Sequence, residues 1–175
     1  IRAESLLASD SARIRVLAAN AIVTDPFDDF FDRFEDMNEV RRVEAAKLVR
    51  RIDGELFEKL HERLNSRNIE ERLKALRILN YTGVDESLEE ALVMAARDSN
   101  NRIRASVPYV LGRITSADAA KAVLWLLKDF DLRVRANAVE GIELFGRSTL
   151  GKVLIPFLGS AVPRVRANAA KAMYR

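Results

Sequence analysis

The residues of this chain that could do acid–base or metal chemistry are few and scattered. His61 is the only histidine, and it lies beside Glu62 and Arg63 with no second metal ligand at a useful spacing. The chain has no cysteine, so disulfides and cysteine-based metal sites are excluded. It also has no glycine-rich phosphate loop and no nucleophile elbow. We therefore predict a protein that is not an enzyme and that needs no cofactor and no metal.

An acidic cluster near the N-terminal end is the next candidate for a cation site: Asp28, Asp29 and Asp32. It lacks the alternating ligands and the glycine of a calcium loop. Phenylalanines recur in the same stretch at the i, i+3, i+4 and i+7 positions of one helix face: Phe27, Phe30, Phe31 and Phe34. We interpret the stretch as an amphipathic helix after Asp25 and Pro26, with a phenylalanine core and a solvated acidic face.

The arginines are the chemically active residues with regular spacing. Arg133-Val-Arg-Ala-Asn-Ala138 returns unchanged at Arg164-Val-Arg-Ala-Asn-Ala169, and Arg102-Ile-Arg-Ala-Ser-Val107 is a looser copy. One marker arginine per copy gives spacings of 27, 30, 32, 31 and 31 residues. The markers are Arg15, Arg42, Arg72, Arg104, Arg135 and Arg166. Such self-similarity predicts a repeat array.

Helices must position these arginines, because apolar residues recur at helical spacing and no window alternates as a strand does. Besides the phenylalanine helix, we expect helices at about 12–22, 38–52, 55–65, 68–80, 86–97, 100–114, 117–128, 131–145, 148–159 and 163–174. The helix at 38–52 should bury Val40, Val43, Ala46 and Val49. Pro108 and Pro156 fall inside expected helices, where each removes a backbone hydrogen bond and should bend the helix.

These patterns predict one all-α domain over residues 1–175, a superhelix of about six helical hairpins of roughly 31 residues each. Each repeat has a leading helix, a short polar turn and a motif helix that carries the arginines. The chain starts at Ile1 without Met and ends at Arg175 inside an expected helix. We expect it to be a piece of a longer protein.

The fullest copy of the motif is Asp129-Phe-Asp-Leu-Arg-Val-Arg-Ala-Asn-Ala138. It joins an acidic turn to a branched apolar residue, an arginine, two variable positions and an alanine. With this period and motif the chain resembles HEAT repeats, especially the short bacterial variety also found in phycobilin lyase subunits. Arg41 and Glu71 stand where the branched residue belongs, which leaves the helical phase of the second and third repeats open by about one residue. The resemblance implies an α-solenoid whose second helices line the concave side.

Each marker arginine lies one helical turn after a loop that is rich in Asp, Asn or Ser. We predict that their guanidinium groups bind carboxylates and carbonyls of their own turn or of the neighbouring repeat. Their methylene stems would cover the core between repeats. A row of anion-binding sites is the alternative.

A second set of residues should form a surface stripe along the motif helices. The companion arginines lie two residues before the markers, on another side of the helix, and other cations, tyrosines and asparagines continue the line. The stripe consists of Arg13, Lys47, Lys74, Arg77, Arg102, Tyr109, Arg133, Asn137, Arg164, Asn168 and Lys171. It suits an acidic peptide and also a phosphate backbone, and an ordinary solvated face is the alternative. A second patch is Trp125 with Phe130, which is a partner hot spot if Trp125 points outward and a packing contact between repeats otherwise.

The net charge of +3 is modest and makes indiscriminate nucleic-acid binding less favoured. The sequence has no apolar run long enough for a transmembrane helix and no signal-peptide pattern. With the absence of cysteine, this leads us to expect a cytoplasmic protein. Our leading hypothesis is a non-catalytic scaffold that binds an acidic segment of a partner protein on its concave face. The alternatives are a nucleic-acid-binding HEAT-like protein and a lyase or chaperone-type subunit acting on a chromoprotein.

Overall fold

The computed structural model describes residues 10–12, 25–145 and 154–174. These residues form helices joined by short turns, and none of them belongs to a strand. No helix among them is long and apolar enough to span a membrane. The chain divides into two compact units, residues 1–56 and 57–175. The predicted helix at 12–22, the marker Arg15 and the stripe residue Arg13 lie outside the described residues.

The first unit contains α3 (Pro26–Arg33), the 3-10 helix η1 (Phe34–Asp36) and α4 (Glu39–Ile52). The Asp25 side chain caps α3 by accepting a hydrogen bond from the Phe27 backbone N–H at 2.8 Å, and Pro26 occupies the first turn, where its missing N–H is harmless. All four predicted phenylalanines of the helix face are buried. Their rings pack in tilted and edge-on pairs with centroids 5.5 and 5.7 Å apart. The phenylalanine core is therefore confirmed.

The buried face of α4 differs from the prediction. Ala46 and Val49 are buried, but Val40 is 66% exposed and Val43 is 37% exposed. Arg42 takes the inward position instead: its Nε donates to the Phe34 carbonyl oxygen at 2.9 Å, and its guanidinium lies 4.7 Å from the centroid of the Phe34 ring. The face thus runs through positions 42, 46 and 49, because a long arginine stem can replace a valine against an aromatic ring.

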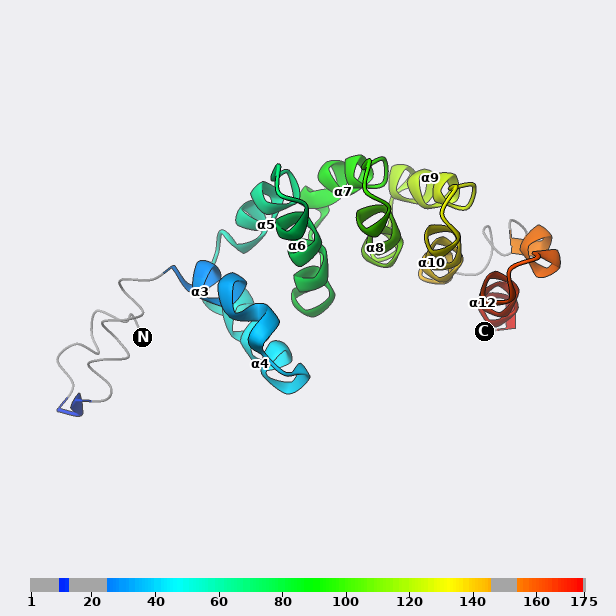
Figure 1. Ribbon diagram of the computed structural model, residues 1–175. Coiled ribbons are helices and arrows are strands. Elements are labelled where there is room, and N and C mark those ends of the chain that lie inside the picture. The colour runs from blue at the N-terminus through cyan, green and yellow to red at the C-terminus, as the bar shows by residue number, and fades with distance from the viewer. Residues whose placement is uncertain (1–9, 13–24, 146–153, 175) are drawn as a thin grey trace. The chain divides into compact units, whose positions relative to one another are not determined.

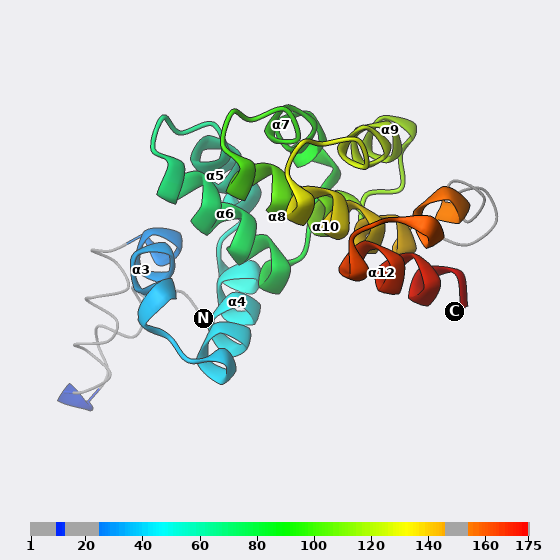
Figure 2. The same ribbon diagram turned by 45° about the vertical axis from the view of Figure 1, so that its right-hand side comes forward.

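The second unit is built from helical pairs in two layers (Figure 1). One layer, here called the outer layer, holds α5 (Leu56–Leu64), η2 (Glu86–Leu88) with α7 (Glu89–Ala95), α9 (Ala117–Leu126) and η3 (Ile155–Gly159). The other, here called the inner layer, holds α6 (Ile69–Thr82), α8 (Asn101–Leu111), α10 (Leu132–Glu143) and α12 (Pro163–Tyr174). Figure 2 shows the same two layers after rotation. The inner layer consists of the motif helices.

The repeated motif supplies the core between the layers. Its branched residues Ile103, Val134 and Val165 are buried, and so are the small residues that end it, Ala138 and Ala169. The buried leucines of the leading helices face them, among them Leu60, Leu92 and Leu126. The apolar half of the motif therefore packs repeat against repeat, as the sequence predicts.

Two adjacent inner helices, α8 and α10, approach closely at a glycine. A Cβ added to Gly141 would lie 2.5 Å from the Pro108 carbonyl oxygen, and one added to Gly112 would lie 2.6 Å from the Gly141 carbonyl oxygen. Helix α8 continues through Pro108 to Leu111. Pro156 lies in the first turn of the 3-10 helix Ile155–Gly159, where a proline is tolerated. Pro108 therefore lies inside a helix, as predicted, whereas residues 148–153 of the other predicted helix lie outside the described residues.

Candidate partner-binding surfaces

The marker arginines form a ladder between successive repeats of the second unit. Arg72 donates from Nε and Nη2 to the Asp98 carboxylate, at 3.0 and 3.3 Å. One repeat later, Arg104 binds the Asp129 carboxylate in the same way, at 2.7 and 3.1 Å. The third guanidinium nitrogen donates to a carbonyl of the turn before its own helix, Ser66 for Arg72 and Asp98 for Arg104, at 2.7 and 2.8 Å. Each guanidinium thus joins its own turn to the next repeat.

The aspartates of the ladder also hold the turns that lead into the next motif helices, because each accepts a hydrogen bond from the backbone N–H of the N-cap residue, Asn100 or Asp131. Asp129 Oδ1 accepts from the Asp131 backbone N–H at 2.8 Å, and only 3% of the Asp129 side chain is exposed. The hydrogen bonds from Arg104 lower the pKa of the Asp129 carboxyl, and the Asp131 N–H adds to this, whereas burial acts in the opposite direction. A carboxylate held in this way stays ionised and stabilises the junction.

The ladder changes at the last junction. The residue one period after Asp98 and Asp129 is Ser160, whose Oγ accepts from the Val162 N–H at 3.2 Å and so keeps the equivalent hydrogen bond. Arg135 still binds the Asp129 and Phe130 carbonyls through Nη1, at 2.7 and 3.3 Å. Its Nε and Nη2 make no hydrogen bond within the described part of the chain. The carboxylate that the Arg135 fork would meet is missing from the sequence.

The companion arginines Arg102, Arg133 and Arg164 are exposed on the motif helices, and two of them reach the preceding motif helix. Arg102 forms an ion pair with Glu70 of the preceding motif helix at 2.7 Å. Arg164 Nη2 lies 3.0 Å from Asn137 Oδ1 and 3.9 Å from Glu140. Arg133, between them in the row, is exposed, and its guanidinium makes no hydrogen bond or ion pair with any described residue.

Two asparagines of the predicted stripe connect backbones. Asn137 Nδ2 donates to the Ala105 carbonyl oxygen at 2.7 Å, and Asn168 Nδ2 donates to the Ala136 carbonyl oxygen at 3.0 Å. Each bond links neighbouring inner helices. Sequence reasoning missed these links, although the return of Asn at the same motif position 31 residues later was a usable signal. Their part in binding a partner stays a prediction.

The remaining stripe residues are spread over both units. Lys74 and Arg77 are half-buried on α6, and Lys171 lies 3.8 Å from Glu143. Tyr109 is exposed on α8 and lies under the Arg113 guanidinium, 4.7 Å from the ring centroid. Lys47 is exposed on α4 in the first unit. The structure therefore brings the stripe together only within residues 57–174.

The stripe residues of this unit and the charged side chains that contact them, here called the inner face, are mostly basic. The cations are Lys74, Arg77, Arg102, Arg113, Arg133, Arg164 and Lys171, and the carboxylates paired with them are Glu70, Glu140 and Glu143. The sequence from Leu144 to Arg175 contains no Asp or Glu at all. Positive charge therefore increases toward the last repeat of the array.

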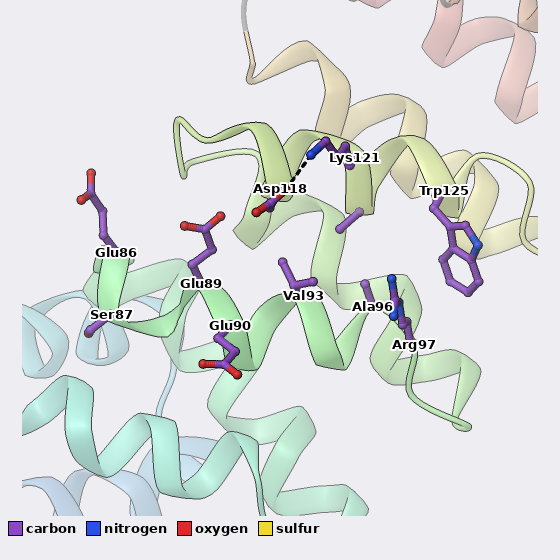
Figure 3. A pocket seen from close by; sticks show the side chains of 11 residues that line it. Glu86, Ser87, Glu89, Glu90, Val93, Ala96, Arg97, Asp118, Lys121 and Trp125 are labelled. Atoms are coloured by element: carbon purple, nitrogen blue, oxygen red, sulfur yellow. Dashed lines mark hydrogen bonds and ion pairs between the residues drawn. The ribbon is translucent and has the colours of Figure 1, made fainter.

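The outer layer presents a different surface, centred on Trp125. This side chain, the only tryptophan of the chain, is 53% exposed. It borders a depression of about 760 Å³ between α7 and α9, which Figure 3 shows. It also borders a depression of about 530 Å³ that Leu124, Pro156 and Phe157 help to line. Phe130 is fully exposed and lines neither depression, so its place in one patch with Trp125 stays a prediction.

The candidates for acid–base and metal chemistry stay apart from one another. His61 is exposed on α5 with Asn65 beside it, and Asp29 is paired with Arg33 at 3.3 Å. Among the residues that the structure describes, no group of three or more His, Asp or Glu side chains could hold a metal ion.

Comparison with known proteins fits this architecture. Residues 57–129 match the family model for HEAT repeats. This part of the chain is a HEAT-repeat array. Among solved structures, the chain is similar to human deoxyhypusine hydroxylase in complex with glycerol, with a TM-score of 0.55 and 24% identity. No curated protein sequence matches the chain.

The likeness to deoxyhypusine hydroxylase concerns the fold. It covers 67% of this chain and 42% of the enzyme, so the chain matches less than half of that enzyme's length. The predicted all-α class is confirmed for the described residues, and the predicted HEAT repeats are confirmed for residues 57–129. The count of about six repeats over residues 1–175 stays a prediction.

Proposed function

We propose that this HEAT array is a non-catalytic scaffold that binds an acidic segment of a partner protein along its inner face. The observation that carries the proposal is the row of Arg102, Arg133 and Arg164, with Arg133 exposed and without an ion pair among the described residues. Guanidinium groups form forked, charge-assisted hydrogen bonds with carboxylates. An unpaired arginine inside a row of cations therefore favours an anionic partner.

The spacing of the row sets the form of the ligand. Packed helices lie about 8–10 Å apart, so equivalent residues of successive repeats present a cation at about that interval. A segment in the polyproline II conformation advances about 3.1 Å per residue and has three residues per turn. Carboxylates on every third residue of such a segment lie on one side, about 9 Å apart, and would then meet successive arginines. Tyr109, which is half-exposed and carries the Arg113 guanidinium over its ring, would offer an aromatic surface to the same ligand.

A spacing series tests the proposal. Fluorescently labelled peptides of equal length and composition would carry Glu at every third residue, at every second residue, or in one block. We expect the every-third peptide to bind the chain most tightly, and the equivalent lysine peptide not to bind. Equal affinity for all three glutamate peptides would contradict the proposal that the arginine row selects ligands by the spacing of their carboxylates.

Nucleic acid is the competing ligand, because the same cations could neutralise phosphates. Duplex and single-stranded DNA should be titrated beside the every-third peptide over a range of salt concentrations. Binding to DNA that is tighter than binding to the peptide, with a steep loss as salt increases, would replace the protein partner by a phosphate backbone.

A further inference from the structure

The depression between α7 and α9 has a charged end and an aromatic end (Figure 3). Glu86 and Glu90 are exposed at the charged end, and neither makes a hydrogen bond or ion pair through its side chain with a described residue. Asp118 is also at this end but is already paired with Lys121 at 2.8 Å. The unpaired charge of this end is therefore negative, in contrast to the inner face.

The other end has apolar side chains and one cation. Val93 of α7, Ala96 directly after it and Trp125 of α9 line this end, and Arg97 lies beside Ala96. Trp125 exposes about half of its surface between two adjoining depressions. A large aromatic side chain that separates two hollows is typical of an anchor site in a protein–protein interface.

From this arrangement we propose that the α7–α9 groove binds a basic amphipathic helix of a partner protein. The helix would place an apolar side chain against Trp125 and Val93, and Lys or Arg side chains toward Glu86 and Glu90. Seven residues separate Glu90 from Arg97, which lies at the tryptophan end, so the two ends are about 10 Å apart along α7. A ligand helix matches this distance with a basic residue two turns from its apolar anchor.

This groove lies on the outer layer, and its charge is opposite to that of the inner face. The array would therefore hold two partner segments of opposite charge at once, one on each layer. The two sites share no residue, so failure of either proposal leaves the other standing.

The single tryptophan makes the test direct, because all tryptophan emission comes from Trp125 at the edge of this groove. Because Trp125 also borders the depression beside Pro156, the variants below assign a shift to the α7–α9 groove. The probe is a helical peptide with Lys two turns before a Leu–Phe anchor, and its control is the same peptide with Glu in place of each Lys. We expect a saturable blue shift of Trp125 emission with the lysine peptide and none with the glutamate peptide. The double variant Glu86→Lys/Glu90→Lys should weaken binding at least about tenfold, because two attractions become repulsions.

A matched control lies on α5. The double variant Glu58→Lys/Glu62→Lys makes the same charge change, with the same i, i+4 spacing, on exposed positions of the outer layer. It should bind the lysine peptide as the unmodified chain does. By calorimetry, Trp125→Ala should weaken binding at least about thirtyfold, the loss typical of a hot spot.

Three results would overturn the proposal. The first is an equal emission shift with the glutamate peptide, and the second is an α5 control that weakens binding as much as the groove variant does. A blue shift that depends on protein concentration without any peptide would assign the groove to a second copy of the chain.

Discussion

Replacing Asp129 by alanine is the sharpest perturbation of the arginine ladder. The substitution removes both hydrogen bonds from Arg104, at 2.7 and 3.1 Å. It also removes the acceptor of the hydrogen bond from the Asp131 N–H. Arg104 keeps its bonds to the carbonyls of Asp98 and Ser99, so its guanidinium stays in place but loses its counter-ion.

The size of the loss follows from burial. The Arg104 and Asp129 side chains are 15% and 3% exposed. Removing one partner of a buried ion pair costs about 3–5 kcal/mol. Because two carbonyl groups still bind Arg104, we expect a cost at the lower end of this range. Losing the hydrogen bond from the Asp131 N–H contributes about 1 kcal/mol. We expect Asp129→Ala to lower the free energy of unfolding by about 3–4 kcal/mol.

Urea denaturation combined with hydrogen exchange is the appropriate assay, because repeat arrays lose neighbouring repeats locally. Amide protection should fall in α8 and α10 and remain in α6. A double-mutant cycle with Arg104→Met should give a coupling energy of about 2 kcal/mol. Asp118→Ala, which removes an exposed ion pair on α9, should leave the urea midpoint unchanged. A coupling below about 0.5 kcal/mol would refute the ladder as a source of stability.

Three further predictions concern the same stack of repeats. Gly141→Ala should destabilise it by about 2 kcal/mol in urea denaturation, because the new methyl group meets the Pro108 carbonyl oxygen; Gly159→Ala, with open space around it, is the control, and equal effects would contradict the close approach. Ser160→Asp should raise the free energy of unfolding by about 1 kcal/mol by giving Arg135 its missing carboxylate, and the gain should vanish in an Arg135→Met background. The pKa of Asp129 is lowered in the folded chain, so its contribution to the free energy of unfolding is present above the unfolded pKa of about 3.9 and is lost as pH falls below that value. The stability difference between the unmodified chain and Asp129→Asn should therefore shrink on acidification. A difference that stays constant down to pH 2 would argue against the ion pair.

The arginine ladder was predictable because both the arginine and its carboxylate partner repeat in the sequence. Asp98 and Asp129 recur with the period of the marker arginines, and the forked guanidinium group of arginine matches the geometry of a carboxylate. The phenylalanine face of α3 was predictable for a similar reason, since helical spacing alone places the four rings together.

Other features could not be predicted because they depend on which side chains pack between the helices and on how far apart the helices lie. Nothing in the spacing of α4 shows that Arg42 would lie on the Phe34 ring and leave Val40 and Val43 exposed. The bonds from Asn137 and Asn168 to backbone carbonyls depend on how far apart the inner helices lie. That distance is set in part by Gly141, whose contact with Pro108 joins residues far apart in sequence.

The α7–α9 groove was also predictable only in part. Composition identified Trp125 as a residue to examine, because its neighbours in sequence already supply the core. Its pairing with α7 is a tertiary fact that only the packing of two repeats determines.

The most direct test of the scaffold proposal is the affinity of the every-third glutamate peptide for the Arg133→Glu variant. Arg133 makes no described ion pair, and an acidic residue in the first turn suits the helix dipole, so the free energy of unfolding should change by less than about 0.5 kcal/mol. Arg67→Glu, on an exposed turn before α6, is the matched charge reversal. The account predicts about tenfold weaker binding for Arg133→Glu and unchanged binding for Arg67→Glu. Equal affinities of the two variants would contradict the inner face as the binding surface.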